Sequence, residues 1–173
     1  MSQPTRILLT GPPGSGKTTV ILRTVELLGR RCAGFYTEEV RARGARIGFD
    51  VVALDGKRGA LARVGGGGPR VGKYGVDIAS FEEIGVRALE AGLRDPARLL
   101  IVDEMGKMEF SSDAFVALLP RLFRAPNPLL GTVLARAHRV ADRYRGAPGV
   151  EIVQVTKASR ERLPQELAQR LGG

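Results

Sequence analysis

The sequence predicts a single α/β domain, residues 1–173, with a mainly parallel sheet flanked by helices. Short apolar runs alternate along the chain with segments whose apolar residues recur at helical spacing. A glycine-rich loop lies between the first apolar run and the first helical segment, which is the order of a strand–loop–helix unit. Residues 47–64 alternate apolar and polar side chains instead, and so predict a small antiparallel hairpin inserted into the sheet.

The loop after the first predicted strand carries the most informative motif of the chain. Residues 11–18 fit the pattern G-x-x-x-x-G-K-[ST], the phosphate-binding P-loop. Backbone N–H groups of such a loop surround a phosphate, and the positive end of the following helix lies beside them. Lys17 would reach the β- and γ-phosphates, and the Thr18 hydroxyl would bind Mg²⁺. We expect the following residues to bind nucleotide: Gly11, Pro12, Pro13, Gly14, Ser15, Gly16, Lys17, Thr18 and Thr19.

The remaining elements follow from the same periodicities and from end signals. Ser80 and Glu83 form a capping box at the start of a helix, Ser111 or Ser112 caps the next, and Pro120 should kink or end it. Strands are expected at residues 6–10, within 32–40, and at 47–52, 60–64, 99–102, 129–134 and 151–155. Helices are expected after the P-loop, after residue 80, after residue 112, at 138–144 and up to about 171.

Two acidic residues follow the apolar strand at 99–102, which is the pattern of a Walker B segment. Asp103 would hold Mg²⁺ together with Thr18, and Glu104 would accept a proton from an attacking water. A strand that merely ends in a solvated acidic turn is the alternative, and the P-loop in the same chain favours the functional interpretation. Lys107 is either a group that neutralises charge in the transition state or a surface lysine. Lys17, Glu104 and Lys107 are thus the candidate catalytic residues.

Several further residues have two interpretations each. Thr132 either faces the γ-phosphate or is an ordinary strand former, and the single histidine, His138, is more typical of packing than of catalysis. Glu109 is expected to be structural or to support a catalytic neighbour. Possible nucleotide contacts are Lys73, Tyr74 and Arg160, and the candidates for an arginine finger are Arg136, Arg139, Arg143 and Arg145.

Composition limits the classes of partner. The net charge of +9 would suit a nucleic acid, but the arginines are scattered and aromatic residues make up only 5%, so solvated surface arginines are the simpler explanation. One cysteine excludes an internal disulfide and fits a reducing compartment. No signal-peptide pattern and no membrane-length apolar run is present, so we expect a cytoplasmic protein without a membrane partner, and a monomer.

Four segments together are specific to one family. GPPGSGKTT, GFYTEEVR at 34–41, VGKYGVD at 71–77 and LLIVDEMGKMEF at 99–110 occur in this order, and the chain resembles the small stand-alone P-loop nucleoside-triphosphatases. The resemblance implies a RecA/AAA-like P-loop fold and slow Mg²⁺-dependent hydrolysis of ATP, GTP and other nucleoside triphosphates to the diphosphate and phosphate. Ser159 stands where we expect Asn before Arg160, which leaves base recognition open. The second nucleotide-binding segment implied by the family is Leu99, Leu100, Ile101, Val102, Asp103, Glu104, Met105 and Gly106.

Two other functions fit a P-loop. A kinase of a small molecule or polynucleotide would need an acceptor pocket and a lid, which Arg41, Arg43 and the glycine-rich loop at 65–68 could supply. A nucleotide-gated nucleic-acid-binding ATPase would use the positive net charge. Phosphate release to water without an acceptor distinguishes the hydrolase from the kinase, and binding of RNA or DNA at low salt tests the third function.

Overall fold

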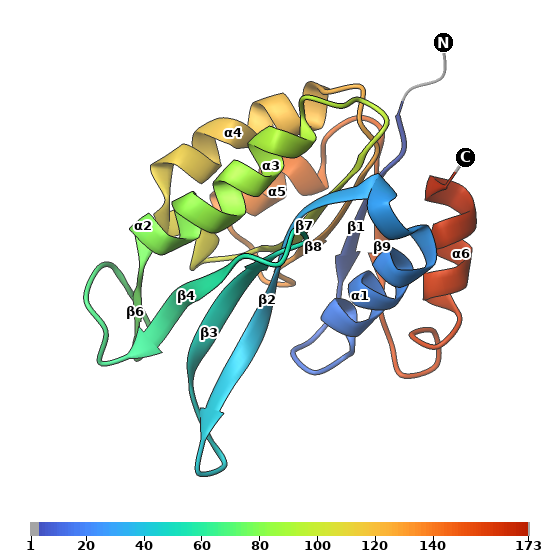
Figure 1. The fold of residues 1–173 in the computed structure, drawn as a ribbon. Coiled ribbons are helices and arrows are strands. Elements are labelled where there is room, and N and C mark those ends of the chain that lie inside the picture. Colours follow the sequence, from blue (N-terminus) through green and yellow to red (C-terminus); the bar gives the residue numbers. More distant parts are fainter. Residues whose placement is uncertain (1–3, 173) are drawn as a thin grey trace.

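A computed structural model describes residues 4–172 and places them in one mixed sheet between two layers of helices (Figure 1). Within these residues the sheet has nine strands, in the spatial order β5-β6-β4-β3-β2-β7-β8-β1-β9. The strands are β1 (Arg6–Thr10), β2 (Cys32–Ala42), β3 (Ala45–Ala53), β4 (Arg58–Val64), β5 (Arg70–Val71), β6 (Tyr74–Val76), β7 (Leu99–Met105), β8 (Leu129–Val133) and β9 (Val150–Gln154).

The helices cover the two faces of the sheet unequally. Figure 1 shows α1 and α6 on one face and the helices from α2 to α5 on the other. The α-helices are α1 (Lys17–Leu28), α2 (Ile78–Phe81), α3 (Arg87–Gly92), α4 (Asp113–Arg124), α5 (Arg139–Arg145) and α6 (Leu163–Leu171). Short 3₁₀ turns lie at η1 (Gly29–Arg31) and η3 (Glu109–Ser111), and a π-helical segment, η2 (Glu82–Val86), joins α2 to α3.

The expectation of a mainly parallel sheet is wrong. Strands β2, β7, β8, β1 and β9 are parallel, but β3, β4, β6 and β5 are antiparallel and make up an equally extensive half. The physical reason is the length of β2. It pairs with β7 as far as Phe35 opposite Val102 and then runs on to Ala42 as the antiparallel partner of β3. The inserted hairpin therefore begins inside a core strand and is larger than the sequence indicates.

Apolar side chains form a core on each side of the sheet. On the α1 and α6 face, Ile7 and Ile101 of the strands pack with Val20 and Ile21 of α1. On the opposite face, the rings of Phe35, Phe81 and Phe115 meet edge to face, with centroids 5.3 to 6.1 Å apart. Such aromatic pairs add about 0.5–1.5 kcal/mol each beyond the area that they bury. These contacts fix the strand ends that carry the polar residues described below.

The helix ends partly follow the sequence signals. Ser112 caps α4 as expected, since its Oγ accepts a hydrogen bond from the N–H of Phe115 at 3.0 Å. The capping box at Ser80 is wrong, because Asp77 is the N-cap of α2 and its carboxylate accepts from the N–H of Ser80. Pro120 does not end α4, which continues to Arg124. Among residues 4–172, no helix has the length and apolarity that crossing a membrane requires.

Candidate active site

The P-loop joins the buried strand β1 to the first residue of α1, as its motif requires. Gly11 has φ +152°, and a Cβ there would lie 2.8 Å from both the Ser15 hydroxyl and the carbonyl oxygen of Val155. A side chain therefore cannot be accommodated at Gly11 without moving the loop. Gly16, the N-cap of α1, has φ +101°. The loop is thus shaped by its glycines, and it presents the N-terminus of a twelve-residue helix, a position that favours anions.

Two polar side chains at the P-loop could bind an anion. The ammonium group of Lys17 donates hydrogen bonds to the carbonyl oxygens of Gly11 at 2.8 Å and Pro12 at 3.2 Å. Within residues 4–172 no carboxylate forms an ion pair with it. The buried hydroxyl of Ser15 has no hydrogen-bond partner among the described residues. A phosphate oxygen would supply the negative charge and the acceptor that these two groups lack.

Asp103, at the end of β7, faces this loop. Asp103 is only 2% exposed. Its carboxylate accepts hydrogen bonds from the hydroxyls of Thr18 at 2.7 Å and Thr132 at 2.5 Å. Burial raises the pKa of Asp103, while the hydrogen bonds from Thr132, Thr18 and the backbone of Thr37, and the charge of Lys17, act in the opposite direction. The P-loop and the tip of β7 are therefore in direct contact, although they lie 85 residues apart in the sequence.

The donor set at this contact fits Mg²⁺. The hydroxyl of Thr18 and the carboxylate of Asp103 are hard oxygen donors, and Mg²⁺ usually takes one or two protein ligands and completes its shell with water and substrate phosphates. Among the described residues, no group of three or more His, Cys, Asp or Glu side chains could hold a metal ion.

Two further carboxylates meet beside Asp103. Glu104 is partly buried, and its pKa is raised by burial and by the charge of Asp103, against an opposing effect of Lys17. Glu109 is only 4% exposed, and burial and the nearby charge of Glu104 raise its pKa well above the usual value. A Cβ at Gly106 would lie 2.8 Å from Oε1 of Glu104 and 3.0 Å from Oε2 of Glu109. Both carboxyl groups therefore lie close to Gly106.

The structure buries the other residues of the second predicted segment. Leu99, Leu100, Ile101 and Val102 are at most 2% exposed and Met105 is fully buried, because the strand buries both of its faces. Nucleotide contacts along this segment stay a prediction. The side chain of Lys107 is exposed, and its backbone oxygen accepts a hydrogen bond from Ser111.

Most of the open alternatives are resolved by contacts. The Thr132 hydroxyl is directed at Asp103 and so orients the carboxylate. His138 is the N-cap of α5, where its Nδ1 accepts from the N–H of Val140 and its ring stacks on Phe110, so it has a structural role. Arg145 donates to the backbone oxygen of Leu134 and pairs with Asp142. Arg136, Arg139 and Arg143 are exposed.

Arg160 lies against the P-loop, and its contact with nucleotide stays a prediction. Its Cδ would be 3.1 Å from a Cβ at Gly16, and it helps to line a cavity of about 240 Å³ beside α1. The other residues of this cavity are Gly16, Thr19, Arg23 and Glu161. Lys73 and Tyr74 lie instead in the antiparallel half, where the ammonium group of Lys73 sits 5.5 Å from the centre of the Tyr74 ring.

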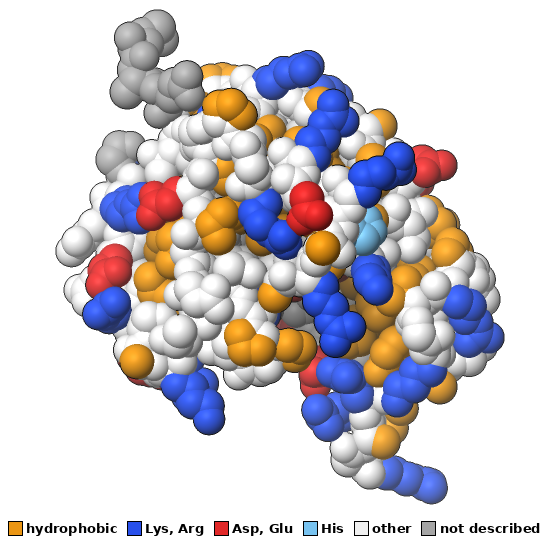
Figure 2. All heavy atoms as spheres, turned by 180° about the vertical axis from the view of Figure 1, so that it is seen from behind, with side chains coloured by type: hydrophobic (Ala, Val, Ile, Leu, Met, Phe, Trp, Pro, Cys, Tyr) orange, Lys and Arg blue, Asp and Glu red, His pale blue; other side chains and the backbone are white. Residues whose placement is uncertain are grey.

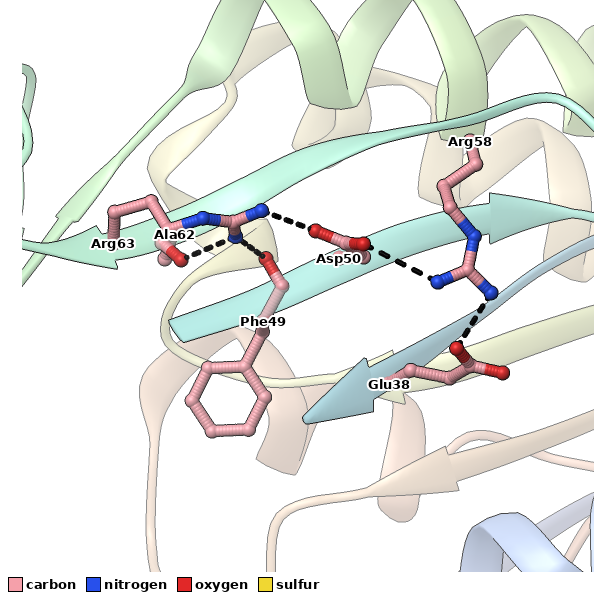
Figure 3. Close-up of polar contacts among 6 residues, drawn as sticks. All are labelled: Glu38, Phe49, Asp50, Arg58, Ala62 and Arg63. Atoms are coloured by element: carbon pink, nitrogen blue, oxygen red, sulfur yellow. Dashed lines mark hydrogen bonds and ion pairs between the residues drawn. The ribbon is translucent and has the colours of Figure 1, made fainter. Parts of the chain in front are cut away.

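A polar cluster in the antiparallel half has a different character (Figure 3). Arg58 of β4 pairs with Glu38 at 2.6 Å and Asp50 at 3.3 Å, and Arg63 pairs with the other oxygen of Asp50 at 2.5 Å. Every acid in this cluster has an arginine partner, and the pairs tie β2, β3 and β4 together. A charge-balanced cluster of this kind is explained by the sheet alone, and we assign it no catalytic role.

Sequence reasoning included Ser15 in the P-loop without indicating that its hydroxyl is unpartnered, and it missed Thr37 as a site residue. The unpartnered hydroxyl of Ser15 follows from the loop conformation, which the motif does not reveal, since the position is free in the pattern. The backbone of Thr37 lowers the pKa of Asp103, and it lies on β2, which is the neighbour of β7. The only available signal for Thr37 was its place inside the segment GFYTEEVR.

Comparison with known proteins decides the family. A family model described as NTPase matches residues 6–168. The chain belongs to this NTPase family. Nucleoside-triphosphatase THEP1 of Thermotoga petrophila is 42% identical over 163 residues, which cover 94% of this chain and 90% of that protein. The human cancer-related nucleoside-triphosphatase is 40% identical over 173 residues, covering 91% of each protein.

Solved structures agree with the fold of this NTPase. The crystal structure of THEP1 from the hyperthermophile Aquifex aeolicus matches with a TM-score of 0.89 at 33% identity, over 98% of this chain and 100% of that chain. The solution structure of a human cancer-related nucleoside triphosphatase has a TM-score of 0.80 at 38% identity, over 96% of each chain. The expectations of an α/β fold, of this family and of a nucleoside-triphosphatase enzyme are confirmed; the sheet is mixed.

Proposed function

We propose that this NTPase hydrolyses nucleoside 5′-triphosphates to the diphosphate and phosphate with Mg²⁺, on a P-loop fold of the RecA/AAA type. The observation that carries the proposal is the hydrogen bond from Thr18 of the P-loop to Asp103 of β7. It brings a phosphate-binding loop and a buried carboxylate to opposite sides of one site. Such a pair is the minimal arrangement for positioning a metal-bound triphosphate.

Binding of the triphosphate rests on groups that lack a negative partner. Lys17 and the N–H groups of the loop would surround the β- and γ-phosphates, with the N-terminus of α1 adding its partial positive charge. Thr18 and Asp103 would hold the cation, and Thr132 would keep the carboxylate of Asp103 in orientation. A bound Mg²⁺ would neutralise negative charge on the phosphates that it contacts.

Glu104 is the proposed general base. A water oxygen attacks the γ-phosphorus, the bond to the β–γ bridging oxygen breaks, and Glu104 accepts the proton that the water loses. The charge of Lys17 favours the ionised form of this carboxyl, which burial alone would disfavour. Lys107 keeps the role of a cation that could approach the γ-phosphate, on the basis of its exposed position beside Gly106.

We propose broad specificity for the base. The cavity beside Gly16 offers the guanidinium groups of Arg23 and Arg160, and arginine planes can stack on any base. The hydroxyl of Ser159 accepts a hydrogen bond from the backbone N–H of Thr156 at 3.0 Å. We therefore assign it no hydrogen bond to the base of the nucleotide. The serine that replaces the expected asparagine therefore closes a turn.

A nucleic-acid partner and a cytoplasmic location stay predictions. On the face shown in Figure 2, lysine and arginine side chains lie among apolar and uncharged atoms, and more of them lie in the centre and right of the view than on the left. The buried single cysteine, Cys32, is compatible with a reducing compartment.

Phosphate release from ATP, GTP, CTP and UTP, each with and without RNA, tests the proposal. We expect Mg²⁺-dependent release from all four without an acceptor. Glu104→Gln should retain nucleotide binding and lose about 100-fold or more in kcat, because it removes a proton acceptor. Lys17→Ala should weaken both binding and turnover. Unchanged release by the Glu104 variant would remove the base assignment, and transfer of phosphate only to an added hydroxyl acceptor would favour a kinase.

A further inference from the structure

The hairpin formed by β2 and β3 extends beyond the rest of the sheet (Figure 1). Strand β2 pairs with β7 only as far as Phe35, and its later residues pair with β3. Because β2 runs in the same direction as β7, β8 and β1, the hairpin leaves the sheet at the edge where the P-loop lies. All residues of the hairpin tip, 41–46, are exposed, and none belongs to either apolar core. Packing therefore gives the hairpin tip no role.

The hairpin tip gathers three arginines. Residues 39–46 contain Arg41, Arg43, Arg46 and the single acid Glu39, and so carry an excess of two positive charges. Arg41 and Arg46 both pair with Glu39, at 2.9 and 2.8 Å. These pairs restrain two guanidinium groups, each of which has five N–H donors and so keeps donors for a further anion. Arg43 has no ion-pair partner among the described residues.

The backbone at Arg43 is unfavourable for an arginine. Arg43 and Gly44 join the two strands, with φ +48° and +80°. Among the described residues, Arg43 is the only one other than glycine with a positive φ. Two-residue turns of this kind favour asparagine or glycine at the first position, since a larger side chain disfavours left-handed backbone. The turn would form more readily without this arginine, so folding of the hairpin does not explain it.

The chemistry of the hairpin tip suits phosphate. The residues between the arginines are small, namely Ala42, Gly44 and Ala45, so the tip lacks the large apolar anchors of protein interfaces and membrane surfaces. Guanidinium groups bind phosphate through paired N–H donors, and small neighbours allow close approach. A two-stranded ribbon also fits the major groove of B-form DNA, about 12 Å wide. In Figure 2 the narrow projection at the lower right is this hairpin, and its end carries lysine or arginine side chains.

We propose that the hairpin tip binds the phosphate backbone of duplex DNA through Arg41, Arg43 and Arg46. A polymer of phosphates fits because it offers several anionic groups to the three cations at once. The proposal goes beyond the hydrolysis of nucleotides, which uses none of these arginines, and it assigns no contact with the edges of the bases.

Fluorescence anisotropy of a labelled DNA duplex of about 20 base pairs, with the full chain and without nucleotide, tests the proposal. Arg43→Asn removes one charge and introduces a residue that the turn favours. We expect it to weaken binding about tenfold at about 50 mM salt and to reduce the slope of log affinity against log salt by about 0.9. Arg43→Lys keeps the charge and should stay within about threefold of the wild type.

A matched control removes the same charge elsewhere. Arg94 is exposed and lies between α3 and the start of β7, at the opposite edge of the sheet. We expect Arg94→Asn to change the affinity less than about twofold and to leave the salt slope unchanged, because it contacts no phosphate.

Thermal unfolding and phosphate release complete the test. Arg43→Asn should unfold at or above the wild-type temperature and keep the wild-type KM and kcat, so that a loss of binding is not a loss of fold. Absence of duplex binding by the wild type at low salt would overturn the proposal. Equal losses in Arg43→Asn and Arg94→Asn, tighter binding to single-stranded RNA than to the duplex, or a raised KM in Arg43→Asn would also overturn it. If the wild type binds the duplex and releases no phosphate, only the proposed hydrolysis fails.

Discussion

Acidic side chains have different surroundings in the two halves of the sheet. In the parallel half, Asp103 and Glu109 are buried with hydroxyl and backbone partners and form no ion pair within residues 4–172. In the antiparallel half, Asp50 lies between two arginines and Glu38 pairs with one of them (Figure 3). Since an unpaired buried charge opposes folding, the buried acids of the parallel half suit the chemistry proposed above, whereas the paired acids of the antiparallel half join strands.

Substituting one acid from each half gives the largest contrast. We expect Asp103→Asn to lose about 100-fold or more in kcat/KM with Mg²⁺, because a metal ligand is lost, and to unfold at an equal or higher temperature. Asp50→Asn should keep kcat within about twofold and lower stability by about 1 kcal/mol, or a few degrees in the unfolding temperature. Phosphate release and thermal unfolding measure both effects. The contrast between the two halves is wrong if Asp103→Asn lowers only stability and Asp50→Asn lowers activity.

A methyl group added at a glycine tests the site more finely. Gly106→Ala places a Cβ 2.8 Å from Oε1 of Glu104, so we expect a loss of about 10- to 100-fold in kcat. Gly67→Ala in the glycine-rich loop is the matched control, because a Cβ there meets nothing within 4 Å. Steady-state kinetics on both variants should show an effect at Gly106 alone. Equal rates for Gly106→Ala and wild type would mean that the Glu104 carboxylate is not held where the structure places it.

The hydrogen bond from Thr132 to Asp103 should contribute less than the carboxylate itself. Thr132→Val removes the hydrogen-bond donor at nearly constant volume. We expect about a tenfold loss of kcat and a lower affinity for Mg²⁺, because supporting partners orient a metal ligand. Thr132→Ser keeps the hydroxyl and should remain near wild type. A magnesium titration of the rate distinguishes them, and the interpretation fails if the serine variant is as impaired as the valine variant.

The smallest expected effect is a pH dependence of stability. A carboxyl with a raised pKa in the folded state stabilises the fold at low pH, and this contribution is lost as pH rises from the unfolded pKa through the folded pKa. Glu109 is such a group, whereas a glutamine does not titrate. The unfolding temperature of Glu109→Gln minus that of wild type should therefore grow as pH rises above about 4.5. A difference that stays constant with pH would show that Glu109 does not keep a raised pKa.

Local sequence patterns predicted the parallel half of the sheet well. In the antiparallel half these predictions were less accurate, because the pairing of strands there depends on long-range contacts. The P-loop, β7 and Ser112 as a cap follow from motifs whose physical effects are confined to a few neighbouring residues. The extent of the hairpin could not be predicted, since the period-2 pattern begins at residue 47 while β2 already carries the antiparallel pairing from Phe35 onward. Asp77 replaced Ser80 as a cap because both signals are present and packing selects between them.

By itself, the sequence determined the family, the reaction class and the loop that would bind phosphate, because a run of nine residues contains the whole chemistry of that loop. Only the tertiary structure decided which side chains meet Asp103, that Glu104 and Glu109 share the space at Gly106, and which acids are paired with arginine. These contacts join segments up to 85 residues apart, and the order of strands in a sheet is set by packing of the whole core rather than by any short stretch of the chain.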